Sequence, residues 1–270
     1  MPFFAPGDDP GASFPELLRR LGLDAGAPVA DAAAVAAAGG HRLSLPHATT
    51  CVALKFESGV VMAGDRRATA GNFISHRTIE KVFPADRHSG VAIAGAAGPA
   101  VQMVELFQLQ LEHYEKVEGA PVSLEGKANQ LSQMVRNHLP AAMSGLAVVP
   151  IFAGYDTGRQ AGRIFQYDVT GGRYEEYDHA ATGSGSMQAT TVVKLGWTPS
   201  LGEAEAIDLA LRALLEAADE DSATGGPDLM RGIYPVVATI GAEGFARVDD
   251  EDLAERFRRL FDQIRAERGA

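Results

Sequence analysis

The residues best suited to chemistry are two adjacent threonines, Thr49 and Thr50, where a Gly-, Pro- and Ala-rich stretch meets the first β-rich run. The small residue Ala48 precedes them, which suggests a cleavage point. If the Ala48–Thr49 bond is cut, Thr49 gains an α-amino group with a pKa of roughly 8 beside its own hydroxyl. Thr49 would then supply both a nucleophile and a base. Taken alone, the pair also fits two β-branched residues that begin a strand.

Three further residues would assist such a nucleophile. Asp65 ends the second β-rich run and Lys81 begins the next expected strand, and both lie where apolar residues dominate. An ammonium group near the hydroxyl would lower the pKa of the hydroxyl, and a carboxylate would hold that ammonium charged. Gly95 would let a backbone N–H approach a developing oxyanion without obstruction by a side chain. Each also has an ordinary interpretation, as an ion pair, an exposed strand charge or a turn glycine.

Other routine chemistries lack their motifs in this sequence. It contains no G-x-S-x-G elbow, no H-E-x-x-H zinc motif and no Walker A loop. Its seven histidines are scattered without the spacing of metal ligands. We therefore expect neither a cofactor nor a metal site.

Composition and charge exclude several function classes. The 270 residues include 24 Lys and Arg against 35 Asp and Glu, and the net charge of −11 argues against a nucleic-acid surface. The 46% of hydrophobic residues suffices for a core, but no apolar stretch is long enough to span a membrane. The single Cys51 forbids an internal disulfide, and the N-terminus lacks the basic start of a signal peptide. We expect a cytoplasmic protein.

Composition also divides the chain into two segments. Residues 1–48 begin acidic and Gly/Pro-rich and continue Ala-rich, and we interpret them as a leader or pro-segment. Residues 49–270 would form the functional domain, since about 220 residues are enough to build one such domain.

Hydrophobic patterning predicts the elements of this domain. The expected strands lie at 50–56, 60–65, 81–83, 90–97, 147–155, 163–169, 172–177, 232–240 and 245–248. The expected helices lie at 99–119, 123–138, 187–195, 203–219 and 250–267. Helices that come in pairs between groups of antiparallel strands favour layered α+β packing over a parallel doubly wound sheet. The sequence therefore predicts two sheets covered by two helix layers.

Several separated motifs together resemble a known family. The chain is similar to a β-type subunit of the 20S proteasome, most of all in its actinobacterial branch. The motifs that carry this resemblance are TTCVALKFESGVVMAGDRRAT, EKVF, AIAGAAG, LEHYEK, GSGS and DSATGGPDLMRGIYP. The likeness covers residues 47 to 248. It implies an N-terminal-nucleophile hydrolase fold, a four-layer αββα sandwich, which fits the predicted element order.

The resemblance also implies roles for the site residues. Thr49 matches the family's nucleophile, freed by self-cleavage after Ala48, and Asp65 and Lys81 match the pair that activates it. Gly95 matches the oxyanion donor. The family also has a polar group that surrounds the nucleophile's amine, and the residues that match it here are Ser184, Asp221 and Thr224. The family usually has glycine where Ala48 stands and often serine where Thr224 stands.

The substrate-binding residues follow from the same resemblance. Thr69 and Ala97 match positions whose backbone pairs with an extended peptide. The first specificity pocket would be lined by Ala68, Ile79, Phe83, Ile93 and Val101. These five residues are apolar, so we expect a preference for apolar side chains before the scissile bond. For each of the five, plain core packing is the alternative.

The implied function is that of a threonine endopeptidase made as a precursor. It would assemble with α-type subunits and other β subunits into four stacked seven-membered rings, with an ATPase or other ring activator and unfolded, tagged proteins as substrates. One alternative is the simpler bacterial relative with six-membered rings and a separate ATPase. Another is a structural ring subunit that has lost catalysis, although Thr49, Asp65 and Lys81 count against it.

Overall fold

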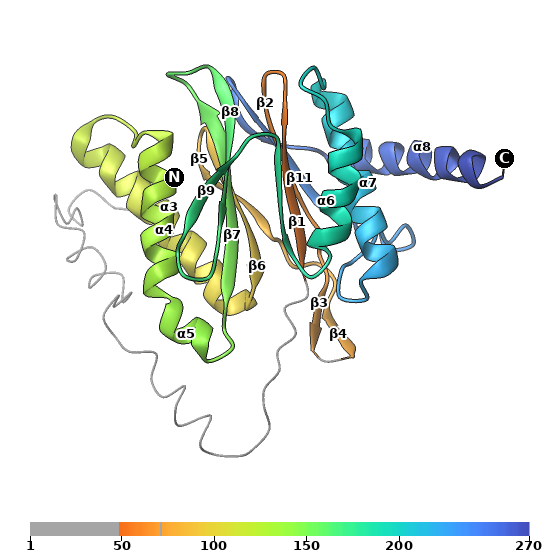
Figure 1. The fold of residues 1–270 in the computed structure, drawn as a ribbon, viewed down its shortest axis with the longest axis horizontal. Helices are drawn as coiled ribbons and strands as arrows, with labels where there is room; N and C mark the ends of the chain where they lie inside the picture. Colours follow the sequence, from red (N-terminus) through yellow and green to blue (C-terminus); the bar gives the residue numbers. More distant parts are fainter. Residues whose placement is uncertain (1–48, 71, 270) are drawn as a thin grey trace, which may run out of the picture.

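Two five-stranded antiparallel sheets stack face to face at the centre of the molecule (Figure 1). The structure, a computed structural model, describes residues 49–70 and 72–269. The first sheet has the order β10-β1-β2-β11-β12 and the second β5-β6-β7-β8-β9. The first contains β1 (Thr50–Phe56), β2 (Gly59–Gly64), β10 (His179–Gly183), β11 (Val236–Gly241) and β12 (Gly244–Arg247). The second contains β5 (Val82–Asp86), β6 (Ser89–Gly95), β7 (Val148–Asp156), β8 (Ala161–Tyr167) and β9 (Arg173–Glu176).

Helices cover the outer face of each sheet, so the molecule has four layers (Figure 1). The second sheet carries α3 (Ala97–Glu118) and α4 (Leu124–Asn137), followed by the short α5 (Leu139–Met143). The first sheet carries α6 (Ser186–Gly196) and α7 (Glu203–Glu220), and α8 (Asp250–Arg268) packs beside α7. This arrangement confirms the predicted α+β class, an αββα sandwich.

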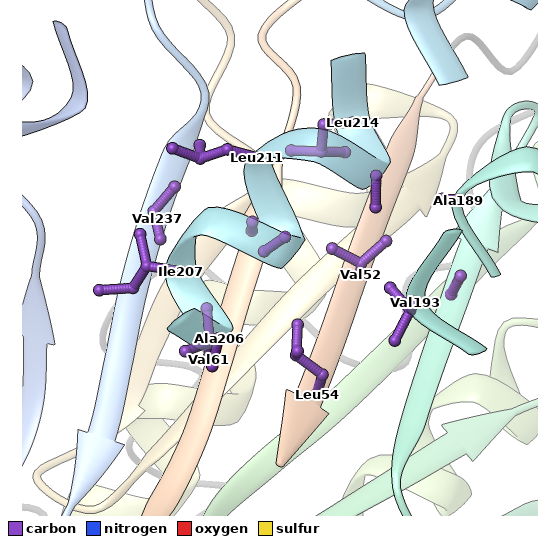
Figure 2. Packing of buried hydrophobic residues seen from close by; sticks show 14 of the residues in the cluster. Val52, Leu54, Val61, Ala189, Val193, Ala206, Ile207, Leu211, Leu214 and Val237 are labelled. Carbon is purple, nitrogen blue, oxygen red and sulfur yellow. The ribbon is translucent and has the colours of Figure 1, made fainter. Parts of the chain in front are cut away.

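The alternation of side chains along β1 explains how one strand serves two cores. Val52 and Leu54 face α6 and α7 (Figure 2), whereas Cys51 and Ala53 face the opposite sheet. Successive side chains of a strand point to opposite faces, and all four of these residues have no exposed surface. A strand buried on both faces therefore has a continuous apolar run, here residues 51–54.

The strands and helices predicted from patterning are present, with shifts at their ends. Patterning does not predict the exposed hairpin of β3 (Ala68–Ala70) and β4 (Phe73–His76), the edge strand β10, or α5. β10 has the sequence HAATG, whose single β-branched residue gives a weak strand signal. Within the described ranges, no helix is long and apolar enough to cross a membrane. The expected leader, 1–48, lies outside the described residues.

Candidate active site

Thr49 stands immediately before β1 and is almost completely buried. Its carbonyl oxygen accepts a hydrogen bond from the backbone N–H of Ser184 at 2.8 Å, which fixes the start of β1 against the turn that follows β10. Gly183 makes this approach possible, because a Cβ there would lie 1.9 Å from the Thr49 carbonyl oxygen. The backbone of Gly183 also has φ +101°, a left-handed conformation that favours glycine. Thr49 is thus held in place by backbone contacts.

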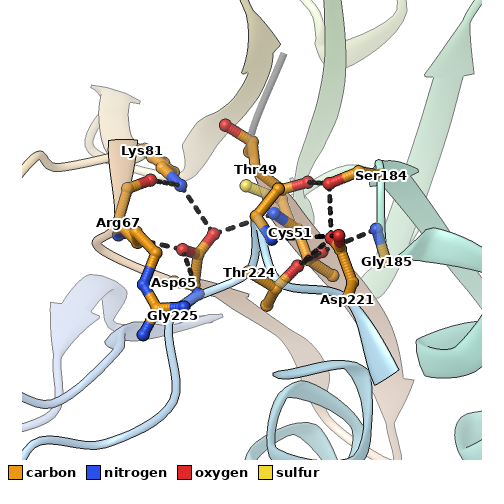
Figure 3. A network of polar contacts seen from close by, with 12 residues as sticks. Thr49, Cys51, Asp65, Arg67, Lys81, Ser184, Gly185, Asp221, Thr224 and Gly225 are labelled. Carbon is orange, nitrogen blue, oxygen red and sulfur yellow. Dashed lines mark hydrogen bonds and ion pairs between the residues drawn. The ribbon is translucent and has the colours of Figure 1, made fainter. Parts of the chain in front are cut away.

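Asp65 and Lys81 form a buried ion pair beside Thr49 (Figure 3). Lys81 Nζ donates to Asp65 Oδ1 and to the carbonyl oxygen of Arg67, each at 2.6 Å. The Asp65 carboxylate accepts from four donors: Lys81 Nζ, Thr50 N at 2.8 Å, Arg67 N at 2.9 Å and Gly225 N at 2.8 Å. A charged pair withdrawn from water is tolerated only with such compensation. Because three of the four donors are backbone N–H groups, the fold itself fixes the position of this carboxylate.

A second polar group approaches Thr49 from the other side (Figure 3). Asp221, just after α7, accepts hydrogen bonds from Ser184 Oγ at 2.5 Å and from Thr224 Oγ1 at 2.6 Å. Ser184 Oγ also lies 3.3 Å from the carbonyl oxygen of Thr49. Partial burial raises the pKa of Asp221, but the hydrogen bonds from Ser184, Thr224 and the Ala223 N–H outweigh it, so this pKa lies below its ordinary value. Asp221 is therefore an ionised hydrogen-bond acceptor at neutral pH.

Gly95 ends β6 in a conformation that a larger residue would strain. Its φ is +123°, and a Cβ would lie 2.1 Å from the carbonyl oxygen of Ala147. Gly95 borders the same cavity as Thr49 and Lys81. The residue expected to donate to an oxyanion is thus close to the expected nucleophile.

A cavity of about 330 Å³ opens beside Thr49. Its lining includes nearly all of the predicted substrate-binding residues: Ala68, Thr69, Ile79, Ile93, Ala97 and Val101. It also includes polar side chains that the sequence analysis missed, namely Ser75, His76 and Glu80. The hairpin of β3 and β4, which patterning did not predict, supplies Ser75 and His76 to the wall.

Phe83 does not line this cavity. It is aligned with Val91 in the pairing of β5 and β6, whereas the carbonyl oxygen of Lys81 accepts a hydrogen bond from the Ile93 N–H beside the cavity. Phe83 therefore lies farther down β5, where it packs against the apolar core between the second sheet and its helices. Its contact with substrate stays a prediction.

Cys51 lies next to the site but is chemically quiet. Burial raises the pKa of its thiol to about 12, and its Sγ lies 3.6 Å from the carbonyl oxygen of Ile93. The thiolate is the reactive form of cysteine, so this thiol is protonated and inert at neutral pH. Among residues 49–70 and 72–269, His, Cys, Asp and Glu form no group of three that could hold a metal ion.

Sequence reasoning missed the residues that act through their backbone. Arg67 and Gly225 donate N–H groups to Asp65, and Gly185 donates its N–H to Thr50 Oγ1 at 3.0 Å. All three lie inside motifs already noted, GDRRAT, GSGS and DSATGG. The pattern marks the segments, but only the folded chain shows which amides point inward.

The four-layer sandwich, with a threonine at the start of a central strand beside a Lys–Asp pair, is the architecture of N-terminal-nucleophile hydrolases. A family model described as proteasome subunit matches residues 45–229, well over half of the chain. The chain therefore belongs to the proteasome subunit family.

Curated relatives support this assignment at high identity, and each carries the name proteasome subunit beta. The protein from Acidimicrobium ferrooxidans is 59% identical over all of this chain and 96% of its own length. That from Streptomyces griseus is 58% identical over 81% of this chain and 78% of its own. That from Jonesia denitrificans is 57% identical over 77% and 69%, respectively.

Proposed function

We propose that this chain is the catalytic β subunit of a proteasome and cleaves peptide bonds with Thr49 as an N-terminal nucleophile. The observation that carries the proposal is the convergence on Thr49 of two polar groups, the buried Asp65–Lys81 pair on one side and the partly exposed Ser184–Asp221–Thr224 group on the other. Removal of residues 1–48 by self-cleavage after Ala48 would free the α-amino group that acts as base.

The proposed reaction uses these groups in sequence. The Thr49 amine accepts the proton of the Thr49 hydroxyl, while the Lys81 ammonium lowers the cost of forming the alkoxide. The hydroxyl oxygen attacks the peptide carbonyl, and the Gly95 N–H stabilises the resulting oxyanion. Collapse breaks the C–N bond, the Thr49 ammonium returns its proton to the leaving nitrogen, and an amine departs while an ester remains on Thr49. Water, activated by the Thr49 amine, then hydrolyses that ester.

The cavity beside Thr49 supports a preference for extended peptides with an apolar side chain before the scissile bond. Thr69 lies in β3 and Ala97 begins α3, and both residues line the cavity. Both can therefore offer backbone groups to a peptide strand. Ile79, Ile93 and Val101 supply apolar wall to the same cavity. The polar Glu80 and His76 at this cavity would modify that preference.

The assembly belongs to the same proposal. The family and the β-subunit relatives support assembly with other proteasome subunits. We propose four stacked rings of seven, in which this chain meets α-type subunits and other copies of itself. An ATPase or other ring activator would deliver unfolded, tagged proteins in the cytoplasm. Counting subunits per ring by electron microscopy tests this arrangement, and six-membered rings would contradict it.

The decisive experiment is co-expression with a matching α-type subunit, followed by intact mass, N-terminal sequencing and peptide hydrolysis. We expect mature chains that begin at Thr49 and cleave a peptide with an apolar residue before the scissile bond. Thr49→Ala should assemble, retain its leader and lack activity, whereas Thr182→Ala, which also removes a buried strand threonine, should mature and cleave. Assembled wild-type particles that keep Met1 and do not react with a threonine-directed covalent probe would contradict the proposal and favour a structural subunit.

A further inference from the structure

The hydroxyl of Thr50 is an unassigned part of this site. Thr50 has no exposed surface, and its Oγ1 lies 2.5 Å from Thr224 Oγ1 and 3.0 Å from the N–H of Gly185. The reaction described above uses neither this hydroxyl nor its two contacts. Thr50 nevertheless joins three segments, the start of β1, the turn before α6 and the loop after α7.

Counting protons fixes the direction of these hydrogen bonds. The ionised Asp221 can only accept, so the single hydroxyl proton of Thr224 is donated to Asp221. Thr224 Oγ1 must then accept the proton of Thr50. The N–H of Gly185 in turn donates to Thr50 Oγ1. The result is one directed chain, from Gly185 through Thr50 and Thr224 to Asp221.

The turn at Gly185 lies close to the hydroxyls of Thr50 and Thr224. A Cβ on Gly185 would lie 2.5 Å from Thr50 Oγ1 and 2.9 Å from Thr224 Oγ1, so glycine is required for the turn to approach both hydroxyls. The backbone of Thr50 is held as well, since its N–H donates to Asp65 Oδ1 and its carbonyl accepts from the Asp65 N–H. Thr50 therefore connects the Asp65–Lys81 pair to the Ser184–Asp221–Thr224 group.

We propose that Thr50 is a positioning residue for peptide hydrolysis, whose hydroxyl orients Thr224 toward Asp221 and so places Asp221 and Ser184 beside Thr49. This inference rests on the proposed peptidase function. A side chain of the same shape without the hydroxyl would leave the Gly185 N–H without an acceptor and Thr224 Oγ1 without a donor, both in a buried place. The loss should affect the chemical step rather than peptide binding, because Thr50 does not line the substrate cavity.

The test compares Thr50→Val with Thr50→Ser in full-length chain co-expressed with an α-type subunit. Rates are expressed per chain beginning at Thr49, counted by mass spectrometry. We expect Thr50→Val to lower kcat roughly tenfold with KM within about twofold, the scale of one lost buried hydrogen bond. Thr50→Ser, which keeps the hydroxyl, should stay within about twofold of wild type. Thr182→Val is the matched control, because it removes a buried strand hydroxyl that donates to the carbonyl of Val149.

A double-mutant cycle with Thr224→Val separates positioning from general destabilisation. If Thr50 acts through Thr224, the double variant should be no slower than Thr224→Val alone. Additive losses, a kcat for Thr50→Val equal to wild type, or an equal loss in Thr182→Val would each overturn the inference. If Thr50→Val slows leader removal, the same comparisons apply to that rate. Failure of the peptidase proposal itself is distinguishable, since wild type would then lack activity that depends on Thr49.

Discussion

Two lysine–aspartate pairs in this molecule have the same chemical groups but different surroundings. Lys81 and Asp65 lie at the Thr49 cavity, with side chains 5% and 0% exposed. Lys127, on α4, pairs with Asp86 at the end of β5, and their side chains are 6% and 18% exposed. The Thr49 cavity includes neither Lys127 nor Asp86. Burial of an ion pair alone therefore does not identify a catalytic group.

The two aspartates differ in what holds them. Asp65 accepts one backbone N–H from its own turn, at Arg67, and two from segments 15 and 160 residues away in the chain, at Thr50 and Gly225. Asp86 accepts instead from its own turn, from the N–H of residue 88 at 3.1 Å and the hydroxyl of residue 89 at 2.5 Å. Long-range backbone donors fix an atom relative to the whole fold, whereas local donors fix it only within its turn. A reaction centre needs the first kind of restraint.

The largest expected effect tests whether the two lysines differ in function. Lys81→Met should lower kcat/KM by roughly 10²- to 10⁴-fold, the range for a side chain that controls proton transfer. Lys127→Met also removes a buried ammonium, but matured particles should keep kcat/KM within about twofold. Hydrolysis of a fluorogenic peptide, normalised to processed chains, measures both. Equal losses of activity in the two variants would break the comparison.

The aspartates should differ in stability. Asp65→Asn places an NH2 group where an oxygen now accepts two donors and leaves Lys81 without its counter-ion, so we expect a loss of about 3–5 kcal/mol. Asp86→Asn should lose less, about 1–3 kcal/mol, because water reaches that side chain. Urea unfolding of each variant beside wild type gives the two free energies. A larger loss for Asp86→Asn would show that local donors matter more than long-range ones.

Two glycines at the cavity extend the comparison from side chains to backbone. Gly95→Ala should destabilise the fold by about 1–3 kcal/mol and lower activity, because its φ is +123° and a Cβ meets Ala147 at 2.1 Å. Gly98 borders the same cavity, but a Cβ added to it would meet no atom within 4 Å. We expect Gly98→Ala to unfold at the wild-type temperature in a thermal melt. A normal melt and activity for Gly95→Ala would remove Gly95 from the site.

The smallest effect concerns Asp168, a carboxylate held by hydrogen bonds without a lysine. Hydrogen bonds from the Thr170 hydroxyl, the Gly172 N–H and the Tyr174 hydroxyl lower its pKa to about 2. A lowered pKa stabilises the fold above the unfolded value near 4 and ceases to do so as pH falls toward 2. Because solvent screens this exposed turn, Asp168→Asn should cost less than about 1 kcal/mol at pH 7.

That cost should shrink when urea midpoints of wild type and Asp168→Asn are compared between pH 5 and pH 3. Asp178→Asn is a suitable control, since it replaces another partly exposed carboxylate, directly before β10. A difference between wild type and Asp168→Asn that grows on acidification would reverse the assigned sign.

The fold could be predicted from sequence where burial imposes a period. Residues 51–54 are apolar throughout because both faces of β1 are covered, and α4 is preceded by its N-cap Ser123, whose hydroxyl accepts from the Gly126 N–H. The hairpin of β3 and β4 carries no such period, since its residues are largely exposed. Its contribution to the cavity wall could not be inferred without the fold.

The candidate site also has residues that could be predicted from the sequence and residues that could not. Charged residues in apolar runs, such as Asp65 and Lys81, are visible in the sequence, and the motif resemblance supplied Ser184, Asp221 and Thr224. Backbone donors carry no side-chain signature, so Gly225 was indistinguishable from any turn glycine. Phe83 is the opposite case: its apolar side chain and its place in the EKVF motif suggested a pocket residue, but it packs against the core of the second sheet and is not part of the cavity lining, so its contact with substrate stays a prediction.

The hydrogen bond from the Gly225 N–H to Asp65 joins residues 160 positions apart in the chain, so its two partners are synthesised at different times. A ribosome adds roughly 5–20 residues per second, so at least several seconds separate the synthesis of the acid from that of its last donor. During that interval the growing polypeptide contains Thr49 and Lys81 but lacks the last N–H donor to the Asp65 carboxylate. The order of translation therefore delays the complete set of hydrogen bonds around Asp65 until most of the protein has been made.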